Sequence, residues 1–148
     1  MSDPYNLNRF VRAQEESYQQ ALSELERGRK QSHWMWYVFP QLDGLGASPT
    51  SKFYSIKSED EARAYLEHPV LGPRLAACAE AVLANDGRSA RAILGSPDDL
   101  KLRSCATLFA HVTTPGSVFE RILDKFYDGE RDAATLRLLS TAATDSAP

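Results

Sequence analysis

Four aromatic side chains stand within the six consecutive residues Trp34 to Phe39, with a histidine and a glutamine on either side. Proteins use flat aromatic rings next to polar groups and cations to stack a nucleobase and to hold a phosphate. His33 and Gln41 supply polar groups here, and Arg29 and Lys30 supply nearby positive charge. The segment therefore predicts a site for a small nucleotide-like ligand. The alternative is that both indole rings are buried in the hydrophobic core.

An extended backbone would sort these side chains onto two faces. Successive side chains of a strand alternate, so Trp34 and Trp36 would share one face, with His33 and Tyr37 on the other. Pro40 excludes the interior of a helix at its own position. We expect one face to pack in the core while the other lines a cleft, with Trp36 toward the cleft and Trp34 beside it.

Two adjacent carboxylates, Asp98 and Asp99, stand shortly before Lys101 and Arg103. Carboxylates can act as general acids and bases, and the two cations could bind an anionic substrate. A structural role is also open, because acids in the first turn of a helix and bases after them complement the helix dipole. The sequence does not choose between catalysis and capping for this pair.

The familiar signatures of phosphate-binding loops, catalytic triads and zinc hydrolases do not occur in the sequence. Its three histidines are far apart, and Cys78 and Cys105 have no neighbouring Cys or His at metal-ligand spacing, which favours reduced thiols in the core. We therefore expect neither a metal nor another cofactor.

The composition fits one globular domain over residues 1–148. The chain has 43% hydrophobic and 25% charged residues and a formal charge of −3, so it lacks the basic excess of a general nucleic-acid binder. The N-terminus has no signal-peptide pattern and the longest apolar run is too short to span a membrane, so we expect a cytoplasmic protein without membrane contact. The oligomeric state stays open.

Helical periodicity dominates the pattern and predicts a mainly α fold of about six or seven helices, with at most two or three short extended segments. Extended segments are expected over Ser32–Leu42 and Ser51–Ile56. The ordered core should cover residues 3–139, with a flexible tail at 140–148. The predicted helices cover Leu7 to Arg29, Ser58 to His68, Pro69 to Ala84, Ser89 to Leu94, Ser96 to His111, Val118 to Tyr127 and Ala133 to Leu139.

Capping patterns mark where two of these helices begin. Ser58 followed by Glu61 is a capping box. Ser96 followed by Pro97 predicts an N-cap serine with proline in the first helical position, directly before the acidic pair.

Five segments together resemble the family catalogued as domain of unknown function 1810, whose bacterial members often carry the label calpastatin. The resemblance covers Asp3 to Leu139. Calpain inhibitors of that name are disordered repeats, whereas this sequence has the periodicity of packed helices, so the resemblance implies a helical fold and not an inhibitor. The segments are DPYNLNRFVRAQ, YQQALSELERGRKQSHWMWYVFPQLDGLG, ARAYLEHPVLGPRL, GSPDDLKLRSCATLF and FERILDKFYDGERDAATLRLL.

The order of features is more distantly similar to the NADAR, or YbiA-like, superfamily, whose better-known members process ADP-ribose-linked or ribosyl-amine compounds. This resemblance implies a YbiA-like fold and an N-glycoside hydrolase. Glu15 and Glu16 are the candidates for that group's early catalytic glutamate. The matching features fall on Gln14, on Trp34 to Phe39, and on Asp99, Lys101, Phe119 and Lys125.

The resemblance also implies roles for the aromatic, cationic and acidic groups. Cleavage of an N-glycoside passes through an oxocarbenium-like state that a carboxylate stabilises. A nucleotide-binding module without turnover and a protein-interaction domain are the alternatives. In the hydrolase, Trp34 or Trp36 would stack the base, Arg29, Lys30 or Lys101 would hold phosphate, and Asp98 or Asp99 would stabilise the cation or activate water.

Overall fold

The computed structural model describes residues 3–145, and over these residues the fold is helical. Within that range the β-structure is limited to an isolated parallel bridge between Leu42 and Ile56. The mainly α prediction is confirmed, but the described residues form nine helices rather than six or seven. They are α1 (Asn8–Arg27), α2 (Met35–Val38), α3 (Pro49–Phe53), α4 (Glu59–Glu67), α5 (Leu71–Leu83), α6 (Ala90–Leu94), α7 (Asp98–His111), α8 (Val118–Tyr127) and α9 (Ala133–Asp145).

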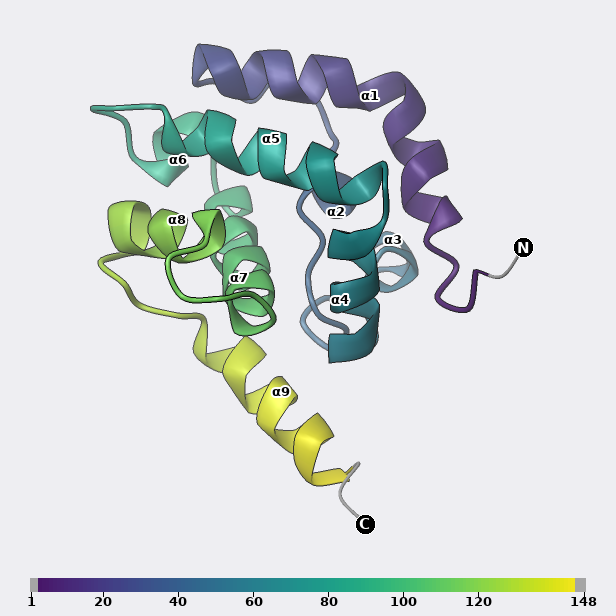
Figure 1. Ribbon diagram of the computed structural model, residues 1–148. Coiled ribbons are helices and arrows are strands. Elements are labelled where there is room, and N and C mark those ends of the chain that lie inside the picture. Colours follow the sequence, from purple (N-terminus) through teal and green to yellow (C-terminus); the bar gives the residue numbers. More distant parts are fainter. Residues whose placement is uncertain (1–2, 146–148) are drawn as a thin grey trace.

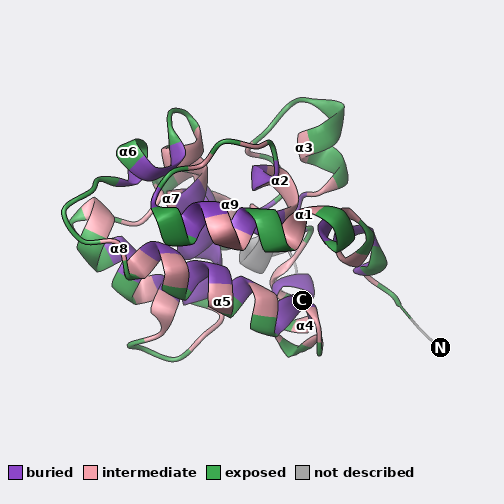
Figure 2. Cartoon of the chain, turned by 90° about the horizontal axis from the view of Figure 1, so that it is seen from above, coloured by how far each residue is buried: buried purple, intermediate pink, exposed green. Residues whose placement is uncertain are grey.

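The helices pack around one hydrophobic core in which α5 and α7 are central. Helix α5 contacts α1, α4 and α8, and α7 contacts α6, α8 and α9 (Figure 1). Phe10, Leu75, Leu108 and Phe109 are at most 1% exposed, and burying each such side chain contributes roughly 1.5–3 kcal/mol. Figure 2 shows how the buried and exposed faces alternate along the helices.

The aromatic segment forms a single helical turn instead of a strand. The backbone N–H of Val38 donates to the carbonyl of Trp34 at 3.1 Å, and that of Phe39 donates to Met35 at 3.2 Å. Pro40 stops the turn but does not prevent the residues before it from being helical. Residues two apart in a helix point in nearly opposite directions, so the prediction that Trp34 and Trp36 share a face is wrong.

The second expected extended segment is also mostly helical. Pro49 occupies the first position of α3, and the hydroxyl oxygen of Ser48 accepts a hydrogen bond from the backbone N–H of Ser51 at 3.1 Å. The segment is extended only at its end, where Ile56 forms the bridge to Leu42. The short helices α2 and α3 account for the difference in helix number.

The capping predictions have different outcomes. Ser58 caps α4, accepting from the N–H of Glu61 at 3.1 Å, as predicted. Ser96 does not cap α7: the N-cap position falls on Pro97, and no side chain accepts a hydrogen bond there.

Residues 140–145, where the sequence analysis predicts a tail, continue α9 to Asp145. The rest of the predicted tail, residues 146–148, lies outside the described residues.

Candidate functional site

A pocket of about 230 Å³ lies beside Trp36, and we call it the Trp36 pocket. Helix α2 supplies the indole, the following loop supplies Gln41, and α7 supplies Lys101. These three residues were all predicted for the site from the sequence, and the fold brings them together from separate segments. The same pocket is lined by Leu100, Ser104 and Asp132, which the sequence did not single out.

The ammonium of Lys101 lies over the indole of Trp36. Its Nζ is 3.6 Å from the centroid of the ring, a cation–π contact of about 0.5–2 kcal/mol. The same Nζ is 3.1 Å from Oδ1 of Asp98, one helical turn earlier in α7. The ring and the aspartate thus both contact the cation at the wall of the pocket.

Asp98 is shared between two lysines. Its second oxygen, Oδ2, is 3.0 Å from Nζ of Lys30, a side chain that is only 8% exposed. The Lys30 ammonium also donates to the carbonyl of Ser32 at 2.6 Å. With a cation on each oxygen, Asp98 serves to position Lys30 and Lys101 and is poorly suited to act as a general base.

Trp34 belongs to the core and does not line the Trp36 pocket. It is 1% exposed, and its indole N–H donates to Oε1 of Glu24 at 2.9 Å. The Glu24 carboxylate also accepts hydrogen bonds from the backbone N–H groups of Gln31 and Ser32 and from the Ser32 hydroxyl. Burial acts to raise the pKa of Glu24, but these hydrogen bonds outweigh it and lower the pKa to about 2. The core alternative therefore holds for Trp34, and the site hypothesis rests on Trp36.

Asp99 is not among the residues that line the Trp36 pocket. Its backbone carbonyl accepts a hydrogen bond from the hydroxyl of Tyr127 on α8 at 2.5 Å. Its Oδ1 is buried and has no hydrogen-bond partner among residues 3–145. Burial raises the pKa of Tyr127, and the nearby charge of Asp99 raises it further.

The other predicted cations and His33 do not reach the pocket either. Arg103 donates to the backbone carbonyls of Glu130 and Arg131 at 3.0 and 3.1 Å, which fastens the loop between α8 and α9. Arg29 and His33 are exposed in the connection between α1 and α2. The fold thus gathers Trp36, Gln41 and Lys101 and separates the remaining candidates from them.

Asp132 is the acid that the sequence interpretation missed. Its Oδ2 accepts from the backbone N–H of Thr135 at 2.9 Å and from the Thr135 hydroxyl at 2.6 Å, an N-cap arrangement at the start of α9. An aspartate three residues before a threonine at a helix start indicates capping and nothing more. Only the packing of α9 against α7 brings this carboxylate to the pocket.

A family model described as "Protein of unknown function (DUF1810)" matches residues 4–139. The chain belongs to this family. A solved structure is also similar: that of the conserved hypothetical protein Rv1873 from Mycobacterium tuberculosis, at 51% sequence identity and a TM-score of 0.92. The similarity covers 93% of this chain and 99% of that one. No curated protein matches the chain. Neither match carries the calpastatin label or the NADAR link.

The glutamates that the NADAR resemblance suggested lie elsewhere in this DUF1810 fold. Glu15 and Glu16 are exposed on α1 and do not line the Trp36 pocket. The neighbouring Gln14 is buried and donates to the carbonyl of Tyr37 at 2.7 Å and to the hydroxyl of Tyr65 at 3.0 Å. Gln14 therefore supports the segment that carries Trp36, without contacting the pocket itself.

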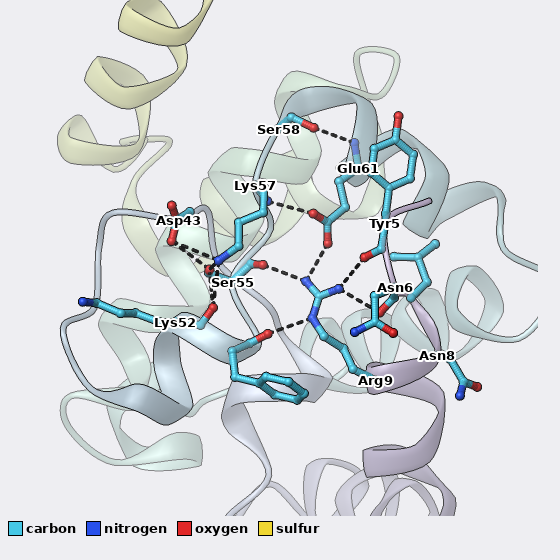
Figure 3. A network of polar contacts seen from close by, with 12 residues as sticks. Tyr5, Asn6, Asn8, Arg9, Asp43, Lys52, Ser55, Lys57, Ser58 and Glu61 are labelled. Carbon is cyan, nitrogen blue, oxygen red and sulfur yellow. Dashed lines mark hydrogen bonds and ion pairs between the residues drawn. The ribbon is translucent and has the colours of Figure 1, made fainter. Parts of the chain in front are cut away.

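A second polar cluster in the DUF1810 chain, centred on Arg9, is structural (Figure 3). Its guanidinium uses all five N–H donors within the protein, so no donor is left for a ligand in the adjacent pocket of about 520 Å³. The second oxygen of Glu61 accepts from the backbone N–H of Lys57 at 3.0 Å. The acceptors of Arg9 are the carbonyls of Tyr5, Asn6, Phe53 and Ser55 and the carboxylate of Glu61, at 2.6–2.8 Å.

The described residues contain no cluster of three His, Cys, Asp or Glu side chains that could hold a metal ion. Cys78 and Cys105 are free and buried, as predicted, and burial raises the pKa of both thiols, that of Cys78 to about 12. No helix within residues 3–145 is long and apolar enough to cross a membrane.

Proposed function

We propose that this DUF1810 protein binds a small nucleotide-like molecule in the Trp36 pocket. The observation that carries the proposal is the juxtaposition of the Trp36 ring and the Lys101 ammonium, 3.6 Å apart, at the wall of a pocket. An aromatic ring can stack against any nucleobase, and a lysine binds phosphate as a point charge. The pocket thus offers one group for each half of a nucleotide.

The size of the pocket limits what it encloses. Its volume of about 230 Å³ is below the roughly 300–1,000 Å³ of drug-sized sites, which fits one ring system with the sugar and phosphate at the mouth. Lys101 has a flexible stem, so a phosphate can draw its ammonium away from the indole and open that ring face to the base. A mononucleotide, or the mononucleotide half of a larger compound, matches this arrangement best.

Calorimetric titration with AMP, GMP and ADP-ribose tests the proposal. We expect Trp36→Ala to weaken binding by about tenfold or more, because stacking contributes roughly 1–3 kcal/mol per base. Lys101→Met should weaken the binding of phosphorylated ligands more than the binding of the free nucleosides. Arg29→Met is the matched control, since Arg29 is exposed and lies outside the pocket. Absence of binding by all three compounds at millimolar concentration would contradict the proposal.

Hydrolysis of an N-glycosidic bond is the second candidate function, and Asp132 is the observation that favours it. Both hydrogen bonds from Thr135 reach Oδ2, which orients the carboxylate in the same pocket as Trp36 and Lys101. In this reaction the bond between the base and the anomeric carbon breaks while water bonds to that carbon. The carboxylate stabilises the positive charge on the sugar and accepts the proton of the water, and the departing base takes a proton from solvent.

Chromatography of the ligand after incubation separates binding from hydrolysis. Released base or ribosyl product shows turnover, whereas intact ligand shows binding alone. Asp132→Asn should abolish release without unfolding the protein, because asparagine is an equally good N-cap for α9. Turnover that survives Asp132→Asn would exclude Asp132 as the catalytic carboxylate.

A further inference from the structure

We infer that Gln41 reads the edge of the bound base and that the Trp36 pocket prefers adenine to guanine; this rests on the proposed function. Gln41 lines the pocket together with Trp36 and Lys101. Its side-chain amide has no hydrogen-bond partner within the part of the chain that the structure describes, so both its donor and its acceptor are available to a ligand.

The backbone of Gln41 is held on both sides. Its carbonyl accepts from the N–H of Ile56 at 2.8 Å, and the N–H of Asp43 donates to the carbonyl of Ile56 at 2.8 Å. Ile56 is fully buried, and the buried Pro40 precedes Gln41. The amide therefore extends from a fixed point, and ordering it on a ligand restricts only side-chain torsions.

The chemistry of the amide selects the base. A carboxamide presents one acceptor beside one donor, which matches adenine N6–H and N7 in a bidentate pair. The adenine Watson–Crick edge offers the same kind of pair through N1 and N6. Guanine presents two acceptors, N7 and O6, on its corresponding edge, which a carboxamide cannot satisfy together. Adenine thus fits Gln41 on either edge and guanine on only one.

Calorimetry with AMP, GMP and purine riboside 5′-monophosphate, which lacks the exocyclic amine, tests the inference on the full chain. We expect the wild type to bind AMP at least fivefold more tightly than purine riboside 5′-monophosphate, which cannot form the bidentate pair, and about twofold more tightly than GMP, which fits Gln41 on one edge instead of two. Gln41→Leu should weaken AMP binding and make the three affinities equal. Gln19→Leu, at an exposed position on α1, should leave the preference unchanged. Thermal unfolding followed by circular dichroism checks that each variant is folded.

Two results would overturn the inference while leaving nucleotide binding in place: equal affinities for AMP and GMP in the wild type, or a preference for AMP that persists in Gln41→Leu. If none of the three nucleotides binds, the proposed function itself fails, and the inference fails with it.

Discussion

Trp34 and Trp36 stand two residues apart and have opposite environments. Trp34 is enclosed in the core with its N–H on Glu24, whereas Trp36 is partly exposed beside Lys101. The sequence shows a cluster of aromatic rings, but the local backbone conformation decides which ring faces the core and which faces the pocket. One helical turn in place of a strand was enough to separate the pair.

Glu24 should make the free energy of unfolding depend on pH in the acidic range. Its pKa is about 2 in the folded protein against an ordinary value of 4.5, so its contribution is fully present above pH 5 and is lost as the pH falls toward 2. The shift corresponds to about 3 kcal/mol. We expect urea denaturation between pH 7 and pH 2.5 to show a steeper loss of the free energy of unfolding for the wild type than for Glu24→Gln.

Glu26→Gln is the control for this comparison, because Glu26 is exposed on the same helix. It should reproduce the acid dependence of the wild type. Parallel pH profiles for the wild type and Glu24→Gln would show that the carboxylate hydrogen bonds contribute no net stability.

At the level of the helices, long periodic segments were predictable and short ones were not. The ranges of α1, α5 and α8 follow directly from apolar spacing, since each buries one face in the core. Helices α2 and α3 have four and five residues, too few for a period to appear. The Ser48–Pro49 pair at the start of α3 has the serine–proline pattern that the sequence analysis considered only at Ser96–Pro97.

Gly28 ends α1 in the left-handed conformation, with φ of +75°, and a Cβ there would lie 2.4 Å from Oδ1 of Asn85. The amide of Asn85 donates to the carbonyls of Leu25 and Ala81, so it joins the C-terminal ends of α1 and α5. Gly28→Ala should therefore lower the free energy of unfolding by about 2 kcal/mol, through backbone strain and displacement of Asn85.

Gly87→Ala is a matched control for Gly28→Ala, because Gly87 has φ of +77° and nothing within 4 Å of an added Cβ. It carries the backbone strain alone and should destabilise by about 1 kcal/mol. If the two substitutions lower the free energy of unfolding equally in urea denaturation, displacement of the Asn85 side chain has no effect on stability.

Across the whole molecule, the Arg9 cluster joins the segment before α1 to the region between α3 and α4. Arg9→Met removes the cation beside the buried Glu61 carboxylate and leaves the carbonyls of Tyr5, Phe53 and Ser55 without their donor. We expect a loss of about 3–5 kcal/mol in the free energy of unfolding and faster amide hydrogen exchange over residues 52–58.

Arg12→Met tests whether this loss is specific, since Arg12 is exposed on the same helix. It should change the free energy of unfolding by less than about 0.5 kcal/mol. If Arg9→Met unfolds at the same urea concentration as Arg12→Met, the cluster does not hold these segments together.

The convergence of Trp36, Gln41, Lys101 and Asp132 is the part of the site that could not be predicted in full. Aromatic and amide groups close in sequence indicated the first two, and a helix start indicated Lys101. Asp132 lies 31 residues beyond Lys101 in the printed sequence and reaches the pocket only because α9 packs on α7. Contacts between distant segments leave no trace in local spacing.

The bridge between Leu42 and Ile56 has a further consequence for how this chain can be altered. The bridge holds the two ends of the segment between them close together. The hydroxyl of Ser55 also donates to Asp43 at 2.9 Å, which links the two ends a second time. Residues 47–50 are exposed at its far side. Extra residues inserted there would lengthen a closed loop without changing the anchor of Gln41, which makes this the natural position for an epitope or a fluorescent label.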